Sequence, residues 1–260
     1  MKVTILGCGG SGGVPYVDGT PGGNWGACDP ANPRNRRRRV SILVESAGTT
    51  VLVDTSPDLR AQFFDAEVRH LDAVVFTHAH ADHAHGLDEL RGFMHARGAP
   101  IDAYMDAETR RALTTRFDYA FASSCDPKSL YRPVFQDRVL DGPARIGALE
   151  VVPFIQGHGT ENTLGLRFGP VAYSTDVVAL DEPAFAALAG VQVWIVDCLR
   201  DRPHPTHSHV AQTLNWITRV KPARGILTHM NHQLDYEDLR RRCPSGVEPA
   251  YDGMVIDIEG

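Results

Sequence analysis

Short apolar runs, separated by polar segments rich in glycine and proline, dominate the hydrophobic pattern of this 260-residue chain. Runs of about five residues rich in valine, isoleucine and leucine are typical of buried strands. In several segments between these strands, apolar residues recur at helical spacing, which predicts helices. Residues 123–142 show no regular pattern and are expected to be irregular. The predicted strands cover residues 2–6, 40–44, 50–54, 71–76, 149–152, 164–168, 171–173, 193–197, 225–227 and 254–258. The predicted helices cover residues 57–66, 87–97, 106–117, 207–220 and 235–242, with one more beginning near Asp181.

The composition is that of a globular protein without a general affinity for nucleic acid or membranes. The chain is 43% hydrophobic and 22% charged, with a formal net charge of −6, which gives no general attraction to nucleic acid or membranes. No linker or repeat longer than a loop interrupts it, so we predict one domain over residues 1–260. Five scattered cysteines without a Cys-x-x-Cys pair, and no stretch of transmembrane length, predict a cytoplasmic protein with no membrane partner.

Residues 77–86, Thr-His-Ala-His-Ala-Asp-His-Ala-His-Gly, follow the predicted strand 71–76 directly. His78 and His80 are two residues apart, so an extended chain places them on one side. Asp82 and His83 follow at a bend, so their side chains can reach a second metal position close to the first. Imidazole and carboxylate are the ligands that zinc and similar divalent ions prefer. We interpret this loop as metal-binding rather than as a solvated connection.

The spacing His78-x-His80-x-Asp82-His83 resembles the signature loop of the metallo-β-lactamase superfamily. That resemblance implies an α/β fold, an αββα sandwich of two mixed sheets flanked by helices. It also implies two divalent metal ions per chain, with zinc or manganese left open. By the family pattern, each ion has three ligands and a seventh residue bridges them. One set is His78, His80 and His158, the other is Asp82, His83 and His229, and the bridging residue is Asp176.

A further histidine narrows the implied chemistry to phosphodiester hydrolysis. His207 lies before a predicted helix and after the strand that ends at Asp197, which resembles the acid histidine of the phosphodiesterase branch of the superfamily. There it would protonate the leaving alkoxide, with Asp197 orienting its ring. We place His207, Asp197 and Asp82 among the catalytic residues. The alternative is that His207 and His209 are ordinary capping and surface histidines.

Three segments together resemble the phosphoribosyl 1,2-cyclic phosphate phosphodiesterases of the carbon–phosphorus lyase pathway: residues 7–15, 82–87 and 227–235. The resemblance implies a small phosphorylated substrate, either such a cyclic phosphate or a related cyclic nucleotide. The family also binds a structural zinc through a cysteine cluster and a late histidine. Here the corresponding loop offers Cys28 alone, with His232 as the late partner, so we expect no thiolate-rich zinc site to close there.

Substrate-binding candidates are less sharply defined. Ser11 lies in the glycine-rich loop 7–15, whose amides face either a phosphate or simply a tight strand connection. Arg38 and Arg39 end a basic run that either grips a phosphate or forms a solvated surface. His232 completes the set of candidates. Asp54 either orients a ligand histidine or belongs to the start of the next helix.

Two other functions remain open. A tRNA 3′-processing type of RNA endonuclease would need a long basic extension, which we do not find, so RNA is an unlikely partner. A di-iron redox protein of the same fold usually has glutamate where this chain has His80, together with an added flavin domain. A homodimer is possible.

Overall fold

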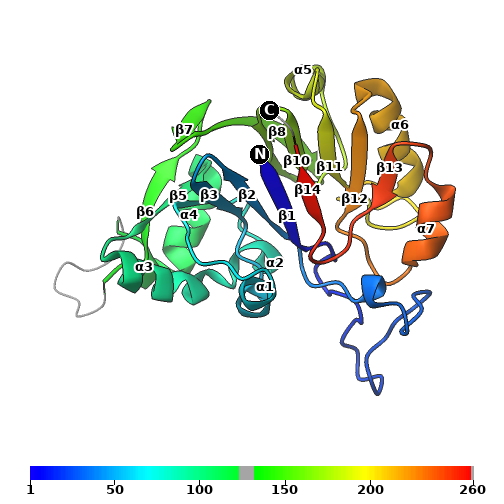
Figure 1. The fold of residues 1–260 in the computed structure, drawn as a ribbon, viewed down its shortest axis with the longest axis horizontal. Coiled ribbons are helices and arrows are strands. Elements are labelled where there is room, and N and C mark those ends of the chain that lie inside the picture. The colour runs from blue at the N-terminus through cyan, green and yellow to red at the C-terminus, as the bar shows by residue number, and fades with distance from the viewer. Residues whose placement is uncertain (123–131, 259–260) are drawn as a thin grey trace.

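The computed structural model describes residues 1–122 and 132–258 of the chain. Within these residues the chain forms two seven-stranded sheets that lie between two groups of helices (Figure 1). Both sheets are mixed, so each combines an antiparallel part with a parallel part. The predicted α/β sandwich of two mixed sheets flanked by helices is therefore confirmed.

The first sheet comes mainly from the N-terminal half of the chain. Strands β14 to β3 pair antiparallel and strands β3 to β6 pair parallel. In order across the sheet, the strands are β14 (Val255–Asp257), β1 (Lys2–Gly7), β2 (Ser41–Ser46), β3 (Thr49–Val53), β4 (Ala73–Val75), β5 (Ile101–Met105) and β6 (Phe135–Val139).

The second sheet comes from the C-terminal half. Its strands β13 to β10 pair parallel and β10 to β7 pair antiparallel. In order, the strands are β13 (Val247–Pro249), β12 (Arg224–Thr228), β11 (Val193–Asp197), β10 (Val171–Ser174), β9 (Glu161–Phe168), β8 (Leu149–His158) and β7 (Ala144–Ile146).

The helices divide between the two sheets in the same way. The first sheet carries α1 (Leu59–Asp65), α2 (Ala81–Ala84), α3 (Arg91–Arg97) and α4 (Ala107–Arg116), and the second carries α5 (Glu182–Leu188), α6 (Val210–Val220) and α7 (Tyr236–Arg242) (Figure 1). Within the described residues, no helix combines the length and the apolar character that crossing a membrane requires.

Successive side chains along each strand point to opposite faces of the sheet, so that one face packs on the other sheet and the other face packs on helices. Val51 and Val53 of β3 belong to a buried cluster that includes Leu166 and Ile195 of the second sheet. Leu52 points to the opposite face and packs in a separate cluster with residues of α1 and α3. Because successive side chains of a strand point to opposite faces, the apolar run from Val51 to Val53 in β3 buries both sides. The two sheets therefore pack face to face, with helices over the outer faces.

Several predicted elements need correction. The part of the segment 123–142 that the structure describes is not all irregular, because it contains β6; its residues 123–131, including Cys125, lie outside the described residues. The predicted helix 207–220 begins only at Val210. Backbone bonds from Leu199 N to Ser208 O and from Val210 N to Arg200 O keep residues 208–209 extended beside β11. Strands β5, β7 and β13 were not predicted.

Candidate metal centre

The loop after β4 places four metal-type side chains at one edge of the first sheet. His80 has an extended backbone at the N-cap of the single-turn helix α2, so Asp82 and His83 turn back towards the strand end. The carbonyl of Thr77 accepts a hydrogen bond from Leu164 N of the second sheet, at 3.0 Å. Gly86 closes the loop where its α-carbon approaches the Ser56 carbonyl too closely for any β-carbon. The loop is thus held from both sheets.

Three residues around the centre have backbone angles that L-residues rarely adopt. Asp54, Asp176 and His229 have φ of 62°, 53° and 57°, and each follows the end of a strand, β3, β10 or β12. Such left-handed conformations outside glycine cost roughly 1–3 kcal/mol each, and they persist where the surrounding structure enforces them. Here they turn three polar side chains towards one point at the facing edges of the sheets.

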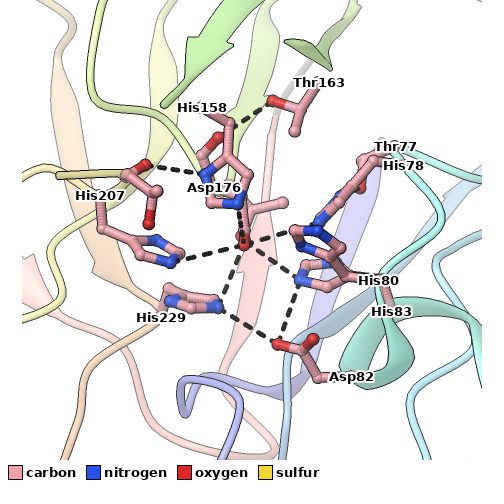
Figure 2. Close-up of polar contacts among 12 residues, drawn as sticks. Thr77, His78, His80, Asp82, His83, His158, Thr163, Asp176, His207 and His229 are labelled. Carbon is pink, nitrogen blue, oxygen red and sulfur yellow. Dashed lines mark hydrogen bonds and ion pairs between the residues drawn. The ribbon is translucent and has the colours of Figure 1, made fainter. Parts of the chain in front are cut away.

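Asp176 lies at the middle of the cluster (Figure 2). Its Oδ1 is 3.0 Å from His83 Nε2 and 3.2 Å from His229 Nε2. Its Oδ2 is 3.7 Å from the Nε2 atoms of both His78 and His158. The two oxygens of one carboxylate therefore face two different sets of imidazoles, an arrangement that suits a bridging ligand.

Asp82 and His80 complete the two sets. Asp82 Oδ2 lies 3.4 Å from His83 Nε2 and 3.6 Å from His229 Nε2. His80 packs edge-on against His78, with ring centroids 4.5 Å apart. The donor atoms of His78, His80, His158 and Asp176 lie within 4.8 Å of one another, and so do those of Asp82, His83, Asp176 and His229. All seven side chains that the family pattern implies thus meet in two groups that share Asp176.

Partners on the far side of the rings fix which nitrogen faces the centre. His83 Nδ1 is 2.7 Å from Asp54 Oδ2, and His158 Nδ1 is 2.7 Å from the Thr206 carbonyl. Because a carboxylate or carbonyl oxygen can only accept, each Nδ1 carries the hydrogen and each Nε2 is left for a ligand. Thr77 Oγ1 donates to Asp54 and accepts from His78 Nδ1, so His78 follows the same rule.

Buried nitrogens without a hydrogen-bond partner indicate that the residues fit a metal. The Nε2 atoms of His78, His83 and His229 are buried and have no such partner. A buried polar atom left unpaired costs free energy comparable to a lost hydrogen bond, so three of them aimed at one carboxylate call for an external partner. Imidazole nitrogens and carboxylate oxygens suit zinc and manganese alike.

The pKa values show how strongly the cluster attracts positive charge. Burial would raise the pKa of Asp176, but His229 and His83 lower it well below its usual range. Burial would lower the pKa of His229, but Asp176 outweighs this and raises it to about 9. On the other side, burial lowers the pKa of His78 well below its usual value, and His83 lowers it further. Asp176 thus draws positive charge to His229, whereas His78 is kept neutral, the form in which an imidazole binds a metal.

His207 lies at the rim of this centre, in contact with Asp197. Its Nδ1 is 2.9 Å from Asp197 Oδ2, and its Nε2 is 3.8 Å from Asp176 Oδ2. Asp197 is fixed in turn by the backbone N–H of Val177, which donates to the same Oδ2 at 3.0 Å. The structure therefore brings His207 and Asp197 together as predicted. The Nδ1 atom of His209 contacts Gln212 Oε1 at 3.2 Å.

The predicted phosphate-binding arginines lie elsewhere. Arg38 forms an ion pair of 2.7 Å with Asp65, and Arg39 one of 2.8 Å with Asp58. Both guanidinium groups are thus engaged by carboxylates at α1. Two arginines that the sequence analysis did not single out, Arg111 and Arg116 of α4, instead line a cavity beside His78 and His80. On a short exposed helix, such residues look like an ordinary solvated face.

The glycine-rich loop 7–15 approaches the centre mainly through its backbone. A β-carbon on Gly10 would lie 3.4 Å from the His229 ring, so the loop packs against a candidate ligand. The amides of Gly9, Gly10, Gly13 and Val14 already donate to backbone carbonyls. These four amides therefore serve the tight connection. Ser11 is exposed on the same loop, and its contact with a substrate stays a prediction.

His232 and Cys28 meet at the base of the loop that follows. The His232 ring stacks on Tyr16, with centroids 5.8 Å apart. The buried Cys28 thiol donates to the carbonyls of His232 and Leu234 rather than facing the His232 ring. Burial raises the pKa of Cys28, which favours the thiol over the thiolate that metals bind.

Comparison with known proteins agrees with this geometry. Residues 49–230 match the family model described as the β-lactamase superfamily domain. A crystal structure described as a new diphosphatase from the PhnP family superposes with a TM-score of 0.87 at 31% identity, covering 99% of this chain and 98% of that one. The zinc-bound PqqB structure from Methylobacterium extorquens superposes with a TM-score of 0.73 at 20% identity, covering 99% and 100%, which shows a shared fold.

A curated relative has a different name. An octanoyltransferase of Porphyromonas gingivalis (strain ATCC BAA-308 / W83) is 29% identical over 265 residues, a match that covers all of this chain and 52% of that protein. The chain spans about half the length of this relative. The match to the superfamily model and the similarity to the PhnP-family structure together identify the chain as a member of the β-lactamase superfamily, in the branch that resembles the PhnP family.

Proposed function

We propose that this protein is a dinuclear-metal hydrolase that cleaves a phosphodiester. The most suitable substrate is a small cyclic phosphate, such as phosphoribosyl 1,2-cyclic phosphate or a related cyclic nucleotide. One observation carries the proposal: His207 points its Nε2 at the same carboxylate that the two ligand sets share, while Asp197 holds its Nδ1. The similarity to a diphosphatase of the PhnP family supports phosphate chemistry.

The ligand sets define what the chain would hold. His78, His80 and His158 would bind one divalent ion, Asp82, His83 and His229 the other, and Asp176 both. When bound, such a pair of ions activates water at neutral pH and neutralises charge on the phosphate oxygens. Asp54, Thr77 and the Thr206 carbonyl keep the rings oriented, since each fixes an Nδ1.

His207 supplies the proton in this proposal. Its Nδ1–H donates to Asp197, which orients the ring so that Nε2 faces the centre. A ribose alkoxide is a poor leaving group, so it needs this proton as the ester bond breaks. The phosphodiesterase activity, the choice between zinc and manganese, a cytoplasmic location and the homodimer all stay proposals.

The test uses leaving groups of different basicity. In His207→Ala, kcat on a ribose cyclic phosphate should fall by roughly 10²–10⁴-fold, the usual contribution of a positioned acid. On bis-(p-nitrophenyl) phosphate the loss should be much smaller, because p-nitrophenolate leaves without a proton. Metal content, measured on the same samples, should match the unsubstituted protein.

His209→Ala is the matched control, because His209 lies two residues away and contacts Gln212. It should behave like the unsubstituted protein on both substrates. Equal losses on both substrates in His207→Ala, or loss of metal, would show that His207 is a ligand or a structural residue. No hydrolysis of either substrate by the metal-loaded protein would refute phosphodiesterase activity itself.

A further inference from the structure

A cavity of about 230 Å³ opens directly beside the candidate metal centre. His78 and His80 form its inner wall, Arg111 and Arg116 of α4 one side, and Glu161 and Asn162 of the β8–β9 hairpin another. Its volume lies below the roughly 300–1,000 Å³ of sites for drug-sized ligands, so it suits a compact group rather than a polymer strand. A group that entered it would remain attached to a phosphodiester at the metals.

Arg116 gives this cavity cationic character. Its guanidinium donates to the carbonyl of Ala79, the residue between His78 and His80. Within residues 1–122 and 132–258 no carboxylate forms an ion pair with it. A guanidinium has five N–H donors in a planar fork, which matches the oxygens of a phosphate. One donor is used by the loop, so the group is fixed in place while others stay available.

The other charged side chains at the cavity each lie near a group of opposite charge or near a histidine. Glu161 Oε2 lies 3.2 Å from His80 Nε2. Arg111 lies 3.7 Å from Glu108 one turn earlier on the same helix, and both side chains are about three-quarters exposed. An exposed pair of this kind is weak, so a phosphate in the cavity can compete with Glu108 for Arg111.

We propose that Arg116 and Arg111 bind a second anionic group of the substrate, a phosphate or diphosphate remote from the bond that is cleaved. This inference rests on the proposed phosphodiesterase function and adds a specificity subsite to it. The preferred substrates are then phosphodiesters that carry an additional phosphate group. Arg38 and Arg39, the arginines that the sequence suggested for this role, are already paired with Asp65 and Asp58.

The experiment measures competition, so that it does not depend on the competitor being cleaved. The metal-loaded full chain hydrolyses bis-(p-nitrophenyl) phosphate, and two competitors that differ by one group are compared: uridine 2′,3′-cyclic phosphate with and without a 5′-phosphate. The unsubstituted protein should bind the 5′-phosphorylated competitor more tightly, by about tenfold or more. Arg116→Ala and Arg111→Ala should each reduce that preference by up to about tenfold, which corresponds to about 1.4 kcal/mol.

Two further variants sharpen the result. Glu108→Gln removes the carboxylate that competes for Arg111, so the preference for the 5′-phosphorylated competitor should rise about two- to threefold. Arg240→Ala is the matched control: Arg240 is also an exposed helical arginine paired with a glutamate three residues earlier, Glu237, but it lies on α7. Its preference should equal that of the unsubstituted protein. Arg111→Lys should retain part of the preference because it keeps the charge.

Equal inhibition constants for the two competitors, or inhibition by neither, would overturn the subsite while leaving phosphodiesterase activity intact. An equal change for both competitors in Arg116→Ala, together with lost metal, would show that Arg116 only supports the Ala79 loop. Failure of the unsubstituted protein to hydrolyse bis-(p-nitrophenyl) phosphate would instead refute the proposed function from which the subsite follows.

Discussion

Two polar clusters of this protein differ in the cation that they contain: one is built to bind an external metal ion, and the other contains an arginine side chain. The Asp176 cluster consists of the seven candidate ligands at the facing edges of the sheets. The Arg37 cluster consists of Arg37, Cys28, Asn35 and the Asn231 carbonyl at the base of the long N-terminal loop. In the Asp176 cluster the carboxylates of Asp82 and Asp176 form ion pairs with histidines alone within the described residues. The Arg37 cluster contains its own cation.

The contacts of Arg37 are made almost entirely with neutral acceptors. Its side chain is about 1% exposed, donates at 3.1 Å to both the Asn231 carbonyl and Asn35 Oδ1, and approaches Cys28 Sγ at 3.9 Å. Asn35 continues the network to Asp235 at 2.6 Å. The guanidinium thus joins residues nearly 200 positions apart in the sequence without an external ion.

A metal site and a structural polar core differ in the partners of their buried polar atoms. Buried imidazole nitrogens that converge on a carboxylate without a hydrogen-bond partner call for an external cation. A guanidinium that donates to carbonyls calls for none. The resemblance to the cyclic phosphate phosphodiesterases implies a zinc held by several cysteines in this loop, and this chain has a buried arginine beside its single cysteine. Arg37 joins this loop to the Asn231 carbonyl through its own donor.

The largest expected effect is at Asp176. Asp176→Ala should remove the carboxylate shared by both ligand sets, so both metal equivalents should be lost. Activity should fall by at least roughly 10³-fold, since even single electrostatic groups of an active site contribute about 10²–10³. Asp82→Ala is the matched comparison, because Asp82 belongs to one set, and it should lose about one equivalent. Metal analysis of protein purified without chelator measures both.

Equal metal content in Asp176→Ala and the unsubstituted protein would contradict the bridging role. Full loss in Asp82→Ala would show that the two ions bind as one unit, and a single equivalent in the unsubstituted protein would contradict the dinuclear centre. Loss of both equivalents in Asp176→Ala and of one in Asp82→Ala would instead separate the Asp176 cluster from the Arg37 cluster, for which no metal is expected.

Much of the Asp176 cluster could be predicted because its chemistry is concentrated in consecutive residues. His78, His80, Asp82 and His83 lie within six positions after an apolar strand, and the period of the strand fixes their directions. The remaining ligands lie about 75 to 150 positions later, so their inclusion relied on resemblance to a family. The positive φ angles of Asp176 and His229, which turn them inward, leave no trace in the residue types.

Other features could not be predicted because tertiary contacts determine them. β7 and β13 have three residues each, too few for a periodic pattern. β6 alternates buried and exposed residues within a segment rich in polar residues. Helix α6 starts late because the Ser208 side chain donates to the Asp197 carbonyl at 2.5 Å. Arg37 lies within a run of arginines, and nothing in that run distinguishes the one that becomes buried.

Arg37 is the site of the next largest effect. Arg37→Met keeps most of the side-chain volume but removes the donors, so the Asn231 carbonyl and Asn35 Oδ1 each lose one hydrogen bond. Each acceptor keeps a backbone donor, Leu234 N at 3.3 Å for the Asn231 carbonyl and Tyr236 N at 2.8 Å for Asn35 Oδ1. Losing the two hydrogen bonds from the charged guanidinium should still lower the free energy of unfolding by about 2–4 kcal/mol. Urea denaturation measures the change. Arg36→Met is a suitable control, because Arg36 is exposed and stacks on Trp25 at the surface.

Metal content in Arg37→Met should stay at the level of the unsubstituted protein, since the guanidinium contacts none of the seven candidate ligands in the described structure. A change within experimental error of the Arg36→Met control would show that the loop does not depend on this cation. A gain of metal on loss of the guanidinium would instead show that Cys28 and its neighbours form a latent site.

The smallest effect is expected at Cys28, and it tests the comparison most directly. Cys28→Ser keeps a hydrogen-bond donor for the carbonyls of His232 and Leu234 and changes the side-chain volume little. Because burial raises the pKa of Cys28, the native side chain is already a protonated thiol, and a hydroxyl should replace it with a change in unfolding free energy below about 1 kcal/mol. Metal content should be unchanged.

A thiolate ligand would respond differently, since serine binds zinc poorly and the loss of one equivalent would be accompanied by a large drop in melting temperature. That outcome would make the Arg37 cluster a second metal site, and the distinction between a built-in and an external cation would no longer hold.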